Sequence, residues 1–432
     1  MTHRVRTSTG ADYIPALMLS ATLVTALALA IAPPASTALP DAGSAAGARV
    51  ERVEIEGNRR TSADAVRSWL GVTPGERFDP ASIPALEQRL MNRRIFRRVR
   101  ITGDPGAAGV VVRVAVEERL TLVPIPVAFA SRGVFTGGAV LLDSNVFGRG
   151  KQLVAGGLFS NRGTTGFAIY RDPGIAESRW LLAARLSGGE TRRERLDDRS
   201  LEYAYRDRFL EAAIAGGYRL GAHWSILAGW FERRDEAEAS AGYAAPPESG
   251  PLHGPSLELE LDASDYEGDV TRGVVGRAEL RQGLRLRGRD RDVLHLGAST
   301  TWSGRALRDH AVALTLRLDH VRGDPVLDAV RLGGLPGSRG FQSQGLWAED
   351  AAQAAVEYQV PVWKPGWGAL AVTGFTDAGV VRWRGEETRY LAPGLGMRVF
   401  LRNVAVPLLG FDVAWATTGD RPGFSVQLGF RR

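Results

Sequence analysis

Much of the chain alternates between apolar and polar residues. Between residues 257 and 262, three leucines alternate with two glutamates and an aspartate, and residues 312–319 follow a similar rhythm. Because successive side chains of a strand point to opposite faces, each stretch presents one apolar face and one polar face. The pattern predicts strands of a transmembrane barrel, with leucines against lipid and carboxylates in a wet lumen. A soluble β-sandwich is the alternative.

We predict about sixteen such strands, an even number as bacterial barrels require. They begin near residues 123, 135, 151, 164, 178, 208, 222, 256, 272, 290, 307, 352, 367, 391, 404 and 422. The intervals after even-numbered strands are mostly short, whereas those after odd-numbered strands include 189–207, 234–255 and 322–351. Short turns on one side and long loops on the other are typical of an outer-membrane barrel whose N-terminus lies in the periplasm.

Residues 49–120 follow a different pattern and predict a separate α+β domain. Its order is strand, helix, helix, strand, strand (βααββ), with Gly57 and Asn58 supplying the turn after the first strand. Gly71 ends the first helix. The exposed edge of such a small sheet can pair with an extended incoming chain by β-augmentation. The alternative is that this domain only braces the barrel.

The first 38 residues have the features of a secretory signal peptide. A basic start precedes an apolar run over residues 14–32 and a small-residue exit at residues 36–38. Two prolines directly after the apolar run favour cleavage over a continuing membrane helix, and an uncleaved anchor is the alternative. Residues 39–48 then form a linker of small residues.

A glycine-rich loop within the interval 322–351 carries the candidate site. Glycine allows the backbone to double back, and arginine offers a planar fork that suits carboxylates. Alternation turns Glu357 and Asp377, on the two following strands, towards the lumen. We therefore expect Arg339 to tie the loop to the inner wall. The residues of this predicted loop lock are Gly333, Gly334, Arg339, Gly340, Phe341, Glu357 and Asp377.

These features together resemble the BamA/TamA superfamily of outer-membrane assembly and secretion barrels, also known as the bacterial surface antigen type. Residues 49–120 resemble its periplasmic POTRA domain. The Arg-Gly-Phe stretch resembles the tip of its sixth extracellular loop, which enters the lumen and meets acidic residues. Residues 143–150, 375–379 and 424–430 resemble further family motifs. The resemblance implies that residues 121–432 form a barrel in the bacterial cell outer membrane, with the POTRA-like domain in the periplasm.

The resemblance also implies a lateral seam between the first and last strands. The predicted seam residues are Pro124, Pro126, Phe424, Leu428 and Phe430. Proline has no amide donor, so we expect the first strand to pair poorly with the last. Unpaired backbone groups are costly in lipid, and an incoming strand can replace the lost partners.

An alternative interpretation concerns the glycine-rich loop that carries Arg339. In this interpretation the loop is a plug that only stabilises a closed barrel.

The expected function is assembly, insertion or translocation of unfolded outer-membrane or secreted polypeptides, with the lipid bilayer as a second partner. Periplasmic or inner-membrane accessory proteins are further partners that this function allows. The single POTRA-like domain favours an accessory assembly factor over the main insertion machine. A dedicated secretion pore of the two-partner type and a passive porin are the alternatives.

The composition and the spacing of reactive residues bear on which kinds of chemical site the chain can contain. The chain has no cysteine, which excludes disulfides and thiolate metal sites. Its six histidines show no ligand spacing and no nucleophile elbow occurs, so we predict no catalytic residue, metal or cofactor. The net charge of +6 partly reflects an arginine-rich segment, residues 93–100, which we interpret as a solvated face and not as a nucleic-acid site. After the N-terminus, no apolar run approaches the roughly 20 residues of a membrane helix.

Overall fold

The computed structural model describes residues 47–131, 134–197, 200–239, 249–267, 270–285, 292–307, 309–333, 337–341, 345–401, 407–417 and 425–428. The predicted signal peptide and most of the linker therefore lie outside the described residues. The described residues all belong to one compact unit. Within the described ranges, no helix is long and apolar enough to cross a membrane.

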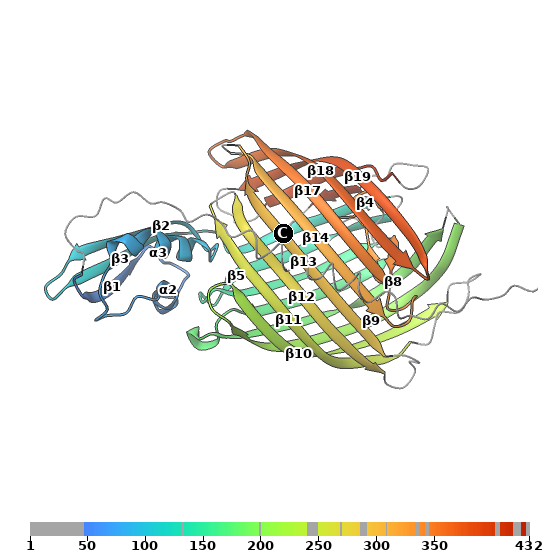
Figure 1. Cartoon of the computed structure of the whole chain (residues 1–432), viewed down its shortest axis with the longest axis horizontal. Helices are drawn as coiled ribbons and strands as arrows, with labels where there is room; N and C mark the ends of the chain where they lie inside the picture. Colours follow the sequence, from blue (N-terminus) through green and yellow to red (C-terminus); the bar gives the residue numbers. More distant parts are fainter. Residues whose placement is uncertain are drawn as a thin grey trace, which may run out of the picture. The chain divides into compact units, whose positions relative to one another are not determined.

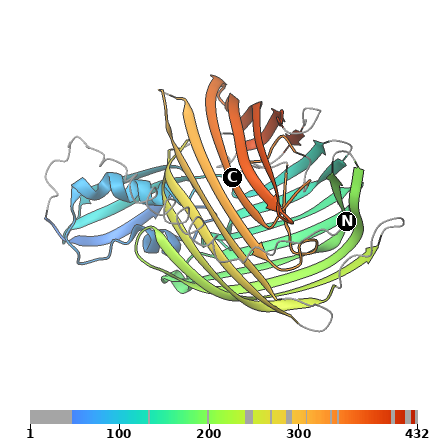
Figure 2. The same ribbon diagram turned by 45° about the vertical axis from the view of Figure 1, so that its right-hand side comes forward.

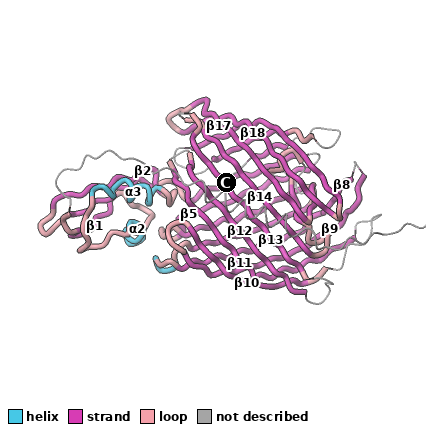
Figure 3. The backbone as a smooth tube through the Cα atoms, viewed as in Figure 1, coloured by secondary structure: helices cyan, strands magenta, loops and turns pink. Residues whose placement is uncertain are grey.

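The N-terminal module has the predicted βααββ order. Its elements are β1 (Val50–Glu56), α2 (Ala63–Leu70), the 3-10 turn η1 (Pro80–Ser82), α3 (Ile83–Met91), β2 (Phe96–Pro105) and β3 (Val110–Glu118). Strand β3 lies in the middle of the sheet, parallel to β1 and antiparallel to β2. Val66 and Leu70 of α2 and Leu90 of α3 pack with Val112 and Val114 of β3, and all five are fully buried. Figure 3 shows most of the helical residues gathered in this module.

The turn after β1 depends on glycine. Gly57 has a φ of +84°, and an added Cβ would lie 2.1 Å from the carbonyl oxygen of Val116. The following loop is held by Glu118, whose carboxylate accepts hydrogen bonds from the N–H of Arg60 (2.9 Å) and of Thr61 (2.7 Å). Burial alone would raise the pKa of Glu118, but these bonds and one from the Thr61 hydroxyl outweigh it and lower the pKa.

Asn58, the second predicted turn residue, also lies in this loop. Its side-chain Nδ2 donates to the carbonyl oxygen of Thr61 at 2.9 Å. Ser62 then precedes α2, and Gly71 ends that helix in the left-handed conformation, as the sequence predicts.

A single antiparallel sheet of sixteen strands holds most of the described residues after the N-terminal module (Figures 1 and 2). Its strands in chain order are β4 (Leu122–Ser131), β5 (Val134–Val146), β6 (Lys151–Ser160), β7 (Gly163–Asp172), β8 (Trp180–Asp197), β9 (Ser200–Arg219), β10 (Trp224–Ala239), β11 (Pro251–Tyr266), β12 (Thr271–Arg285), β13 (Val293–Arg305), β14 (Ala311–Arg322), β17 (Asp350–Trp363), β18 (Gly368–Trp383), β19 (Glu386–Leu401), β20 (Pro407–Ala414) and β21 (Ser425–Leu428). A one-turn 3-10 segment, η2 (Ile175–Glu177), lies between β7 and β8. The predicted strand number is confirmed.

The two faces of the sheet differ in polarity as predicted. On β11, the leucines at 257 and 259 are 43% and 37% exposed on the outer face. The intervening Glu258 points inward and meets Arg277 of β12, with 2.7 Å between Oε2 and Nη2. Glu260 also points inward and pairs with Arg171 of β7, four strands away in the sheet. The outer face is therefore apolar and the inner face is charged.

The interval 189–207, predicted as a long outer loop, is instead a hairpin of β8 and β9. The two strands continue to Asp197 and from Ser200. Arg193 of β8 and Asp207 of β9 are both buried on the inner face, 3.0 Å apart from Nη2 to Oδ2. Because charged residues pair across the hairpin, a run of polar residues did not indicate a loop here. Strands β10 and β11 likewise extend into the predicted interval 234–255.

The sixth outer loop lies between β14 and β17 and contains a short hairpin. Strands β15 (Val330–Leu332) and β16 (Leu346–Ala348) pair with each other and belong to no other sheet of the described residues. Figure 2 shows this segment within the curve of the large sheet. Leu332 and Ala348 pack with Ala351, Val381 and Tyr390 of the wall.

Two turns of the barrel contact the N-terminal module. Asn145, near the end of β5, donates from Nδ2 to Thr61 Oγ1 at 2.9 Å in a buried contact. At the end of β11, the backbone N–H of Tyr266 donates to Oδ1 of Asn92 at 2.9 Å. The first of these turns belongs to the stretch 143–150, which resembles a family motif. In this structure the stretch contacts the N-terminal module.

The predicted seam lies where β4 meets β21. Four residue pairs join these strands, from Ala128 with Leu428 to Ser131 with Ser425. Pro124 and Pro126 lie outside this ladder, are exposed, and pair with β5 on their other side. Phe424 and Phe430 fall outside the described residues, as do the side-chain surroundings of Leu428. Among the described residues no ladder joins β20 to β21. The weakness of the seam stays a prediction.

Candidate functional site: the sixth-loop lock

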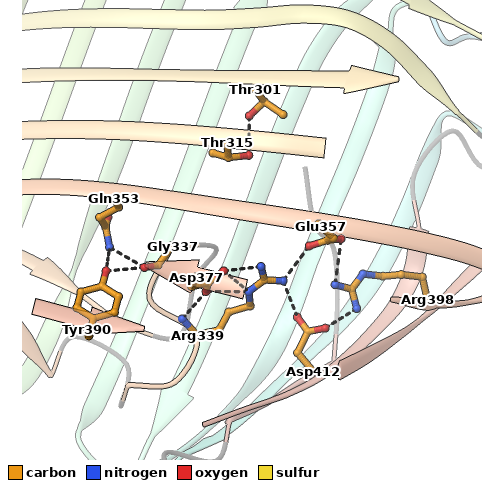
Figure 4. Close-up of polar contacts among 10 residues, drawn as sticks. All are labelled: Thr301, Thr315, Gly337, Arg339, Gln353, Glu357, Asp377, Tyr390, Arg398 and Asp412. Atoms are coloured by element: carbon orange, nitrogen blue, oxygen red, sulfur yellow. Dashed lines mark hydrogen bonds and ion pairs between the residues drawn. The ribbon is translucent and has the colours of Figure 1, made fainter. Parts of the chain in front are cut away.

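Arg339, at the tip of the sixth loop, is fully buried against the inner wall. Its guanidinium contacts Asp377 of β18, with 2.9 Å from Nε to Oδ2 and 2.5 Å from Nη2 to Oδ1. Nη1 donates to Oε2 of Glu357 on β17 at 2.8 Å (Figure 4). The backbone N–H of Arg339 donates to Asp377 as well, at 2.9 Å. The contact predicted from the sequence is present, and it uses both edges of the arginine fork.

Two charged residues that the sequence did not single out extend this contact. Arg398 of β19 donates from Nη1 to Oδ1 of Asp412 on β20 at 2.7 Å, and its Nη2 lies 3.5 Å from Oε1 of Glu357. Oδ2 of Asp412 lies 3.9 Å from Nη1 of Arg339. We call these five residues, Arg339, Arg398, Glu357, Asp377 and Asp412, the lock. Its two cations and three anions connect the loop tip to four neighbouring strands, β17 to β20.

Aromatic rings enclose the lock. The guanidinium carbon of Arg339 lies 3.4 Å from the ring centroid of Phe375, a cation–π contact on β18. Phe341 packs edge-on against Tyr390 of β19, with 4.7 Å between centroids. The hydroxyl of Tyr390 donates to the carbonyl oxygen of Gly337. Arg339 and Asp377 are fully buried, which strengthens their ion pair but also makes a lone charge there costly.

Three glycines belong to the predicted loop lock, and the structure describes two of them. An added Cβ on Gly340 would lie 2.8 Å from the backbone nitrogen of Ala416, so a larger residue would push the loop off the wall. Gly333 begins the turn, and its N–H donates to Ser338 Oγ at 3.1 Å. Gly334 lies outside the described residues.

A second contact holds the base of the loop. Trp347 of β16 is buried between Tyr205 of β9 and Trp383 of β18, with ring centroids 6.4 Å and 6.2 Å away and near-perpendicular planes. We call these three residues the aromatic bridge. Six strands separate β9 from β18 in the sheet. The bridge therefore reaches across the lumen, whereas the lock holds the loop to one side only.

Hydrogen bonds fix the bridge to the loop backbone. Arg331 of β15 donates from Nη2 to the Tyr205 hydroxyl at 2.8 Å and to the carbonyl oxygen of Val326 at 2.9 Å. The indole N–H of Trp383 donates to the carbonyl oxygen of Pro325 at 2.7 Å. Both walls thus hold the same short segment of the loop.

Replacing Trp347 with alanine should loosen the loop base while leaving the lock intact. Truncating a buried tryptophan costs about 3–5 kcal/mol, and the loss falls on the contact that crosses the lumen. We expect larger and more frequent openings in single-channel recordings from planar lipid bilayers. Trp363→Ala is the matched control, because Trp363 is exposed at the end of β17. Recordings from correctly folded Trp347→Ala identical to the parent would contradict a role in closing the lumen.

The N-terminal module matches a known family. Residues 48–119 match the POTRA family model, described as surface antigen variable number repeat. We call this segment the POTRA domain, after the family model that it matches. Its matched bounds agree within one residue with the predicted 49–120, and the POTRA domain keeps its βααββ order throughout.

Solved structures with the same fold include two barrels of different names. BamA from Haemophilus ducreyi lacking POTRA domains 1–3 is 14% identical, covers 88% of this chain and 84% of its own, and has a TM-score of 0.55. CdiB from Acinetobacter baumannii is 14% identical with 88% and 74% covered and a TM-score of 0.61. CdiB from Escherichia coli is 12% identical with 99% and 100% covered and a TM-score of 0.58. No curated protein sequence matches the chain.

The chain therefore joins the POTRA domain to a barrel with the fold seen in BamA and CdiB. The resemblance inferred from the sequence and the predicted fold class are confirmed. At such low identity these structures support the fold alone. What this barrel does must be argued from its own residues.

Proposed function

We propose that the chain is an outer-membrane factor that assembles, inserts or translocates unfolded polypeptides. The POTRA domain receives an extended chain by β-augmentation in the periplasm. The barrel then admits it laterally, at the seam between β4 and β21, where added backbone partners replace those lost on opening. Accessory periplasmic or inner-membrane proteins and the bilayer are the further partners, and no catalytic step, metal or cofactor takes part.

The observation that carries this proposal is a loop that lies inside the curve of the sheet and is held on two sides. The lock ties the loop tip to strands β17 to β20, and the aromatic bridge ties its base to β9 and β18. A passive porin needs a free channel and gains nothing from such contacts. A wall stiffened over these strands supports opening elsewhere in the sheet.

Depletion of the protein in its bacterium tests this function. Quantitative comparison of folded outer-membrane barrels and of exported proteins should show loss of a subset of barrels, as expected of an accessory assembly factor. Loss of nearly all barrels would identify the main insertion machine. Normal levels of every barrel and every exported protein would contradict the proposal.

A dedicated secretion pore is the second candidate. One POTRA domain and a barrel with a loop-filled lumen also suit the export of a single partner protein. In that case, depletion would remove one exported protein and leave the barrels intact.

A further inference from the structure

The POTRA sheet has a free edge along β2. Strand β3 pairs with both β1 and β2, and no described residue pairs with the far side of β2. A free edge displays backbone N–H and C=O groups that can accept another strand. The start of β1, in contrast, is already partnered, because the N–H of Val50 donates to the carbonyl oxygen of Glu76 at 2.8 Å.

The hydrogen-bonding pattern between β2 and β3 determines which backbone groups of β2 face the free edge. Gly106 donates from its backbone N–H to the carbonyl oxygen of Gly109 at 2.8 Å, so the even-numbered residues of β2 pair with β3. The backbone groups of Val99, Ile101 and Gly103 therefore point to the free side. Pro105 closes the row, because it has no N–H.

A helix side chain already occupies the middle donor of this row. The backbone N–H of Ile101 donates to Oε1 of Glu87 on α3 at 2.8 Å. Hydrogen bonds to a carboxylate are stronger than those between neutral groups. An added strand must displace Glu87 before it can pair along the whole edge.

We propose that Glu87 gates the β2 edge of the POTRA domain. The inference rests on the proposed function and refines it: Glu87 disfavours weakly pairing strands and yields to an extended chain that supplies enough new contacts. The Glu87 carboxylate competes with an incoming strand for the N–H of Ile101. Removing it should therefore tighten the binding of an extended peptide to the β2 edge.

The two faces of β2 define the sequence that fits. Ile101 is buried and Val99 is partly buried, on the side of the sheet that packs against Ile83 and Met91 of α3. Arg100 is exposed on the other face. Residues that are opposite each other on neighbouring strands share a face. The favoured partner is thus an extended segment that alternates apolar residues towards α3 with acidic residues beside Arg100. Strands of outer-membrane barrels alternate in this way, as residues 257–262 of this chain do.

Peptide binding to the full-length protein in detergent tests the gate. The probe is a fluorescein-labelled ten-residue peptide of alternating valine and aspartate, followed by fluorescence anisotropy with empty micelles subtracted. We expect Glu87→Ala to bind it about tenfold more tightly than the parent, which corresponds to roughly 1.4 kcal/mol. Glu87→Gln keeps the size and an acceptor oxygen, so its gain should be smaller. Asp64→Ala, on α2, removes the same charge away from the edge and should leave the affinity unchanged.

Two further peptides separate the possible failures. If a peptide N-methylated on alternate residues binds as well as the parent peptide, or if neither binds, β-augmentation and the gate both fail. If only the unmethylated peptide binds, but equally to parent and Glu87→Ala, the gate is overturned while the proposed function stands. If Glu87→Ala binds the acidic peptide more tightly but a valine–lysine peptide more weakly than the parent does, charge alone explains the gain and the gate is also overturned.

Discussion

Arg339→Ala should release the sixth loop and markedly lower the thermal stability of the barrel. The substitution leaves Asp377 fully buried without its main counter-charge, and Glu357 and Asp412 lose a neighbouring cation. Breaking a buried ion pair from one side costs about 3–5 kcal/mol. The temperature at which the folded barrel stops migrating as a compact band in semi-native electrophoresis measures this loss, and protease cleavage within the loop reports its release.

Two companion variants identify the cause. Arg339→Lys keeps the charge but loses the planar fork, so it can serve one carboxylate at a time and should fall between parent and Arg339→Ala. Adding Asp377→Ala to Arg339→Ala removes the stranded carboxylate and should recover part of the stability, because paired residues are not additive. An Arg339→Ala barrel with the parent's unfolding temperature and protease resistance would show that the lock contributes nothing.

Cross-linking β4 to β21 should abolish activity if the seam opens. Ala130 and Val426 are direct partners across these strands, and the chain has no cysteine of its own, so Ala130→Cys with Val426→Cys gives one defined pair. A disulfide there holds the strands together covalently. After depletion of the parent protein, the oxidised variant should fail to restore the affected barrels or exported proteins, and reduction should restore them.

A second pair of cysteines controls for oxidation itself. Leu316 and Ala354 are partners across β14 and β17, remote from the seam in the sheet order. Cross-linking them should leave activity unchanged. Full activity of the seam variant at complete cross-linking would rule out lateral opening at this position. It would leave the POTRA domain and the lock to be explained by passage through the lumen.

The contact between Arg339, Glu357 and Asp377 could be predicted because two local signals coincide. A glycine-rich turn presents one arginine, and period-two alternation fixes which carboxylates of the next two strands face inward. The same alternation located the strands, because each lipid-facing row must be apolar. These are properties of short stretches, and a single sequence displays them directly.

The remaining contacts depend on strand register over long distances. Alternation can turn Arg398 and Asp412 inward, but nothing local indicates that they meet each other and Glu357. Tyr205 and Trp347 lie far apart in the sequence and touch only because the sheet curves round to bring them together. Glu87 looks like any solvated helix residue until the edge of β2 is in place. The missing information is the pairing of distant segments.

The aromatic bridge divides the strands of the large sheet into two groups of eight. The strands from β9 to β18 form a braced arc, because a strut of three aromatic rings joins its two ends. Any increase in girth must then be absorbed by the complementary arc, which contains β20 and β21, the shortest strands of the large sheet. A barrel built in this way cannot widen evenly around its circumference. It widens on one side, and under the proposed function this would fix the side of the sheet at which a polypeptide leaves.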